Sequence, residues 1–115
     1  MENSLGSANS DKLVDIIAEA NVKLYYDVIN MAHYVHRAEA VPGITLQGTD
    51  RICQVHVKNG DRLLEGDVPV DWSAALEDFT AIGYDGWYVL ESRHRSREQL
   101  LEATRRNIDF LWDRL

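Results

Sequence analysis

Three short apolar runs, each closed by a residue that can bind a metal ion or move a proton, constrain the fold of this chain most. The runs are residues 22–26 followed by Asp27, residues 52–57 with His56 near the end, and residues 87–90 followed by Glu91. Runs of this length, rich in β-branched and aromatic residues, predict buried strands. The second run leads into Asn59 and Gly60, a pair that is typical of a turn.

Helix signals lie between the three runs. Residues 11–20 place their apolar side chains on one broad face, and the helix before the second run is expected either to be short or to begin near Pro42. Asp71 or Ser73 can cap a helix that ends at Gly83. Ser96, with Gln99 three residues later, forms a capping box at the start of the last helix. Strands that alternate with helices imply right-handed βαβ crossovers, so we expect an α/β fold with a parallel sheet.

The helical periodicity also predicts which side chains of the two last helices are buried. The helix over residues 71–83 is expected to bury Leu76, Phe79 and Ile82. The last helix is expected to bury Leu100, Leu101, Ile108, Leu111 and Trp112.

Size and charge narrow the class of protein. With 115 residues the chain has enough material for one domain. A net charge of -7 disfavours nucleic acids and anionic membranes as partners. No signal peptide is visible at the N-terminus, and no apolar run reaches the roughly 20 residues of a membrane span. Because Cys53 is the single cysteine, we expect a reducing, cytoplasmic location.

The three residues that close the runs form a candidate metal site. In a parallel sheet the carboxyl ends of the strands meet at one edge, with neighbouring strands about 4.8 Å apart. Asp27, His56 and Glu91 offer oxygen and nitrogen ligands that suit Mn²⁺, Mg²⁺, Co²⁺ or Zn²⁺. The alternative interpretation is that each is simply a polar residue at the end of a strand.

Three segments carry a resemblance to a known family. Residues 25–30 (YYDVIN), 55–59 (VHVKN) and 82–91 (IGYDGWYVLE) resemble the sugar phosphate isomerase/epimerase family, which has a xylose-isomerase-like TIM barrel. The loop at residues 64–72 resembles the glycine-containing segment before the seventh helix of that family. A complete (β/α)₈ barrel needs about 250 residues. The resemblance therefore implies that residues 1–115 are the C-terminal part of such a barrel, in which strands alternate with helices. The chain is then a fragment, a truncated gene product or a half-barrel that assembles with further copies or with the remainder of the barrel.

The resemblance also implies roles for particular residues. The implied metal ligands are Glu2, Asp27, His56 and Glu91. Of these, Glu2 and Glu91 are also the implied catalytic acid and base. The implied substrate contacts are Arg62, Asn30 and Lys58. The remaining histidines, assigned to loops or the surface, are His33, His36 and His94.

The activity that the resemblance implies is a metal-dependent isomerase or epimerase of carbohydrate metabolism. It would act on a sugar or sugar phosphate by proton transfer α to a carbonyl, through an enediolate. An inosose-dehydratase-like lyase and an endonuclease-IV-like phosphodiesterase are alternatives on the same barrel. The endonuclease is disfavoured by the acidic charge and by the lack of a multi-histidine cluster. A non-catalytic fragment or interaction module is the alternative from another class. The sequence leaves open which sugar and which metal are used.

Overall fold

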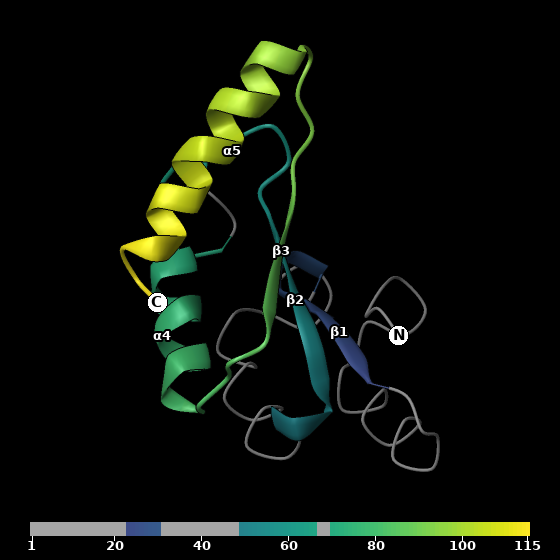
Figure 1. Ribbon diagram of the computed structural model, residues 1–115, viewed down its shortest axis with the longest axis vertical. Coiled ribbons are helices and arrows are strands. Elements are labelled where there is room, and N and C mark those ends of the chain that lie inside the picture. Colours follow the sequence, from purple (N-terminus) through teal and green to yellow (C-terminus); the bar gives the residue numbers. More distant parts are fainter. Residues whose placement is uncertain (1–22, 31–48, 67–69) are drawn as a thin grey trace.

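The computed structural model describes residues 23–30, 49–66 and 70–115 (Figure 1). Its elements in chain order are β1 (Leu24–Asp27), the 3₁₀ helix η2 (Thr49–Arg51), β2 (Ile52–Lys58), α4 (Trp72–Ala81), β3 (Trp87–Glu91) and α5 (Arg97–Trp112). The helices predicted over residues 11–20 and near Pro42 lie outside the described residues, as does Glu2.

The three strands form one parallel sheet in the order β1-β2-β3. In its register Asp27 lies opposite His56, and Lys58 lies opposite Glu91. Each strand extends one residue beyond its predicted end, so that Asp27, Lys58 and Glu91 are the last strand residues. The α/β class, the parallel sheet and the strand positions are therefore confirmed. Figure 1 shows α4 and α5 on the same side of this sheet.

Helix α4 begins and packs as the sequence predicts. The side chain of Asp71 caps it by accepting a hydrogen bond from the backbone N–H of Ala74 at 3.1 Å. Gly83, with a φ of 73°, follows its end. Leu76 and Phe79 are fully buried, and Ile82 packs against the core from a half-buried position. The buried helix face and the sheet therefore share one hydrophobic core.

Helix α5 begins at the predicted cap, but the predicted buried face is largely wrong. The hydroxyl of Ser96 accepts a hydrogen bond from the backbone N–H of Gln99 at 3.2 Å. Of the side chains predicted to be inside, Leu111 alone is buried; the exposed ones are Leu100, Leu101, Ile108 and Trp112. The helix instead docks through Ala103, Asn107, Phe110 and Leu111. The buried Asn107 amide oxygen accepts a hydrogen bond from the backbone N–H of Leu64 at 3.0 Å, so this polar side chain has a partner on the docked face.

No helix within the described ranges is long and apolar enough to cross a membrane.

The outer edge of β3 is flanked by apolar side chains. β3 ends the described sheet, and no described strand pairs with its outer edge. A groove of about 370 Å³ runs between β3 and α5, and its lining includes Trp87, Leu90, Ile108 and Trp112. Both tryptophans of this groove are 77 % exposed. This edge is therefore an apolar surface on the described part of the chain.

Candidate metal centre at the strand ends

The polar side chains of the candidate site come from the ends of all three strands. Side chains two residues apart on a strand point to the same face, so His56 and Lys58 share one face of β2. Val55 and Val57, which alternate with them, are fully buried in the core. The alternation that packs the valines therefore places the imidazole and the ammonium together at the carboxyl end of the sheet.

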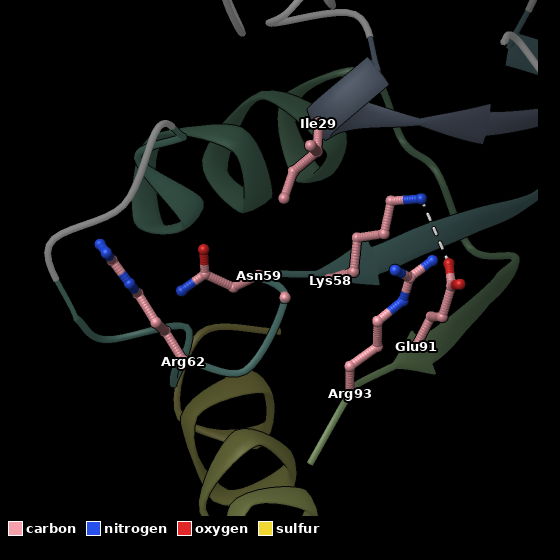
Figure 2. A pocket seen from close by; sticks show the side chains of 7 residues that line it. Ile29, Lys58, Asn59, Arg62, Glu91 and Arg93 are labelled. Carbon is pink, nitrogen blue, oxygen red and sulfur yellow. Dashed lines mark hydrogen bonds and ion pairs between the residues drawn. The ribbon is translucent and has the colours of Figure 1, made fainter. Parts of the chain in front are cut away.

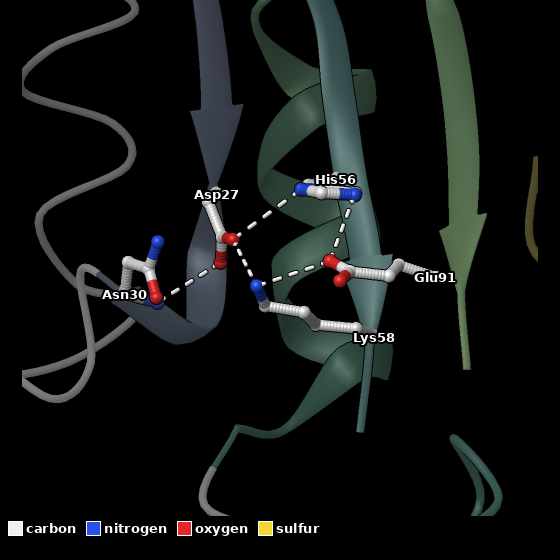
Figure 3. A network of polar contacts seen from close by, with 5 residues as sticks. All are labelled: Asp27, Asn30, His56, Lys58 and Glu91. Carbon is white, nitrogen blue, oxygen red and sulfur yellow. Dashed lines mark hydrogen bonds and ion pairs between the residues drawn. The ribbon is translucent and has the colours of Figure 1, made fainter. Parts of the chain in front are cut away.

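His56 lies between the two carboxylates (Figure 3). Its Nδ1 is 3.4 Å from Asp27 Oδ2, and its Nε2 is 2.9 Å from Glu91 Oε2. One potential ligand atom from each of the three residues lies within 4.8 Å of the others. The structure therefore brings together the three predicted strand-end residues that it describes.

Lys58 joins the same cluster. Its Nζ is 2.6 Å from Asp27 Oδ2 and 3.2 Å from Glu91 Oε2. Burial alone would lower the pKa of Lys58, but the hydrogen bonds and negative charges of Asp27 and Glu91 outweigh it and raise the pKa above its ordinary value. The side chain is therefore a cation at neutral pH.

Two local contacts hold the cluster in place. Asp27 is fully buried, and its Oδ1 accepts a hydrogen bond from the backbone N–H of Asn30 at 2.9 Å. Asn30 thus reaches the site through its backbone, in the helical segment over residues 28–30 that follows β1. The ring of Tyr25 lies against the imidazole of His56, with 4.5 Å between the ring centroids. Sequence reasoning missed Tyr25, although its place two residues before Asp27 puts it on the same face of β1.

A pocket of about 370 Å³ opens beside Lys58 and Glu91 (Figure 2). Arg62, a predicted substrate contact, lines it together with Ile29 and Arg93. Sequence reasoning missed Arg93, which lies in the loop after β3, two residues beyond Glu91.

The loop that forms one wall of the pocket is fixed by short contacts. The backbone N–H of Arg93 donates a hydrogen bond to the carbonyl oxygen of Gly60 at 2.9 Å, which ties this loop to the segment after β3. Gly60 has a φ of 64°, a conformation that favours glycine. The Asn59 amide donates to the carbonyl oxygen of Leu63 at 2.7 Å.

The other predicted residues fall into two groups. His94 lies in the loop after β3 and lines a different pocket, to which Asp61 also contributes. Glu2, His33 and His36 lie outside the described residues.

The donor set suits a divalent cation. Two carboxylates provide hard oxygen ligands, and one imidazole provides a borderline nitrogen ligand. Mn²⁺, Mg²⁺, Co²⁺ and Zn²⁺ accept such ligands, with different preferences for oxygen and nitrogen. The burial of Asp27 and the contacts of His56 pre-organise two of the three donors.

A comparison with models of protein families shows to which family the chain belongs. The sequence model of the family described as xylose isomerase-like TIM barrel matches residues 2–113. The chain belongs to the xylose isomerase-like TIM barrel family. The resemblance seen in the sequence is thereby confirmed.

A solved structure shows the same fold. The chain is similar to a D-psicose 3-epimerase from Clostridium cellulolyticum H10, solved with D-tagatose, at a TM-score of 0.78 and 17 % sequence identity. The match covers 100 % of this chain and 48 % of the epimerase chain. A search among curated proteins finds no match. This chain thus spans about half the length of that epimerase chain, and its open parallel sheet is a partial barrel.

Proposed function

We propose that the protein is a metal-dependent isomerase or epimerase that moves a proton at the carbon α to the carbonyl of a sugar or sugar phosphate. One observation carries the proposal: Asp27, His56 and Glu91 converge within 4.8 Å at the carboxyl end of a parallel sheet. That edge is where barrels of this kind place their active sites. The shared fold with a D-psicose 3-epimerase supports this reaction class.

The metal would be held by Asp27, His56 and Glu91, and by Glu2, which stays a prediction outside the described residues. A bound divalent ion supplies Lewis-acid chemistry, which polarises a carbonyl and makes the neighbouring C–H more acidic. The Asp27 carboxylate would hold the metal without acting as acid or base, because it is buried away from solvent and contacts both His56 and Lys58.

Glu91 would exchange the proton with the substrate carbon. Its side chain is 40 % exposed and lines the pocket, so a substrate in the pocket can reach the carboxylate. In our proposal Glu2 acts from the opposite face of the sugar, and the two carboxylates alternate as base and acid through an enediolate. Before a metal ion binds, His56 Nε2 lies 2.9 Å from Glu91 Oε2, so the imidazole would hold this carboxylate near the metal site.

Substrate oxygens would be bound from the pocket wall. Arg62 and Lys58 line this pocket and carry hydrogen-bond donors that suit hydroxyl, carbonyl or phosphate oxygens. The backbone N–H of Asn30 donates its hydrogen bond to Asp27, so any substrate contact of Asn30 would come from its side-chain amide.

We further propose that the working site includes the remainder of a barrel, from another part of a longer chain or from a second chain such as another copy. The apolar groove between β3 and α5 supports this, because a parallel strand beside β3 and a helix beside α5 would cover Trp87 and Trp112. Without that complement, the non-catalytic alternative describes the chain better. A cytoplasmic location stays a prediction from the sequence.

The test is exchange of solvent deuterium into a ketose. The protein is incubated with Mn²⁺ and D-tagatose or phosphorylated ketoses in D₂O, and NMR follows the proton at the carbon next to the carbonyl. The proposal expects deuterium incorporation that Glu91→Gln abolishes and that Glu102→Gln, a matched change on an exposed carboxylate of α5, leaves intact. No incorporation by the wild type would favour the non-catalytic alternative, and loss of water from the sugar would favour the lyase.

A further inference from the structure

Lys58 contacts the same two carboxylate oxygens that face the imidazole of His56. Asp27 Oδ2 lies 2.6 Å from Lys58 Nζ and 3.4 Å from His56 Nδ1. Glu91 Oε2 lies 3.2 Å from Lys58 Nζ and 2.9 Å from His56 Nε2. Figure 3 shows the ammonium between the two carboxylates. The oxygens best placed for a metal that also binds His56 are therefore already in contact with a cation of the chain.

The positive charge of the Lys58 ammonium affects both the stability of this cluster and its affinity for a metal ion. Asp27 is fully buried, and a buried carboxylate without a counter-charge is strongly destabilising. Lys58 supplies a counter-charge and bridges Asp27 to Glu91 across the sheet. A divalent ion bound to the same carboxylates would repel an ammonium at these distances, since like charges close together in a poorly solvated site interact strongly.

We propose that Lys58 is an internal competitor of the metal ion. Its ammonium holds Asp27 and Glu91 together while no divalent ion is bound, and it leaves the carboxylate pair when the ion binds. This inference rests on the metal centre proposed above. It adds a function for Lys58 that the substrate-contact role does not include.

The pocket gives the displaced ammonium a place to go. Lys58 already lines the pocket, and its flexible four-carbon stem lets the ammonium reorient without movement of β2. In the displaced position the ammonium faces the space that a substrate would fill. Metal binding would then release the cation that contacts a substrate oxygen, so Lys58 links the two binding events.

The proposal predicts opposite effects of removing this charge on metal affinity and on metal-free stability. In Lys58→Met, Mn²⁺ no longer competes with the ammonium, so its dissociation constant should fall about tenfold or more. The same variant should unfold at a lower temperature than the wild type in the presence of a chelator, because Asp27 loses the ammonium that lies 2.6 Å from its Oδ2. Saturating Mn²⁺ should remove that deficit.

Calorimetric titration with Mn²⁺ of the wild type, Lys58→Met and Arg105→Gln tests this. Arg105 is an exposed cation of α5 paired with Glu102, so its replacement makes the same change in net charge away from the site. If Lys58→Met unfolds in chelator, Lys58→Gln, which keeps a hydrogen-bond donor, replaces it in the titration. Tighter binding in the Lys58 variant with no change in Arg105→Gln is the expected result.

Two results would overturn the inference, and they differ in whether the metal centre itself is also rejected. Equal or weaker Mn²⁺ binding in the Lys58 variant, with clear binding by the wild type, rejects the competitor and leaves the metal centre standing. Absence of binding in both proteins rejects the metal centre and the competitor together.

Discussion

His56 Nε2 lies 2.9 Å from Glu91 Oε2, across the boundary between β2 and β3. The other ring nitrogen lies 3.4 Å from Asp27 Oδ2, so one imidazole links carboxylates from both neighbouring strands. The parallel register sets this up, because His56 pairs directly with Asp27 and lies two residues before Lys58, the partner of Glu91. A metal ion bound by His56 would replace one of these contacts, and the other would then orient the ring.

The buried carboxylate of Asp27 should contribute strongly to stability. We expect Asp27→Asn to lower the free energy of unfolding by about 1–3 kcal/mol, because Lys58 loses a charged partner at 2.6 Å. Urea denaturation in the presence of a chelator measures this. Asp61→Asn, which changes an exposed loop carboxylate, is the control and should have little effect. Equal stability of Asp27→Asn and the wild type would contradict the structural role of this pair.

Phe79 should be one of the main anchors of α4 on the sheet. It is fully buried, and its ring contacts Tyr26 at 5.9 Å and Tyr84 at 5.5 Å between centroids. Phe79→Ala should cost about 3–5 kcal/mol, because it opens a cavity in the core. Denaturant unfolding measures the loss against Thr80→Ala, a change at the exposed neighbour. A loss no larger than that of the control would mean that α4 does not pack as described.

Much of the site could be predicted from the sequence, because three strands and their parallel order determine which side chains meet. The apolar runs gave the strands, and their parallel order required Asp27, His56 and Glu91 to meet at one edge. The spacing of two residues from His56 also put Lys58 on the same face. The position of its ammonium between two carboxylates depends on side-chain conformation, which the pattern of residue types does not specify.

The prediction for α5 failed for a different reason. Apolar side chains lie around much of this helix, so periodicity allows more than one buried face. The face that is buried contains the polar Asn107, which pairs with the backbone of Leu64. The exposed Trp112 belongs to the groove beside β3, and a helix placed next to an incomplete barrel leaves such a face uncovered.

Stability should fall in alkaline solution in part through Tyr88. Burial raises the pKa of Tyr88 to about 12, because the ionised phenolate is disfavoured in the core. A raised pKa in the folded protein gives a contribution that is fully present below the unfolded value of about 10 and is lost as the pH rises toward 12. The stability of Tyr88→Phe relative to wild type should therefore be constant up to about pH 10 and rise above it. Unfolding by urea at a series of pH values measures this difference, and a difference that does not vary with pH would contradict the burial of the phenol.

The most direct test of the metal centre is calorimetric titration of Mn²⁺ into the wild type, His56→Ala and the control His94→Ala, which changes a histidine outside the cluster. We expect binding by the wild type and by the control, and an affinity at least about tenfold weaker in His56→Ala. Absence of binding by the wild type, or equal affinity in His56→Ala, would show that the three strand ends do not form a metal site.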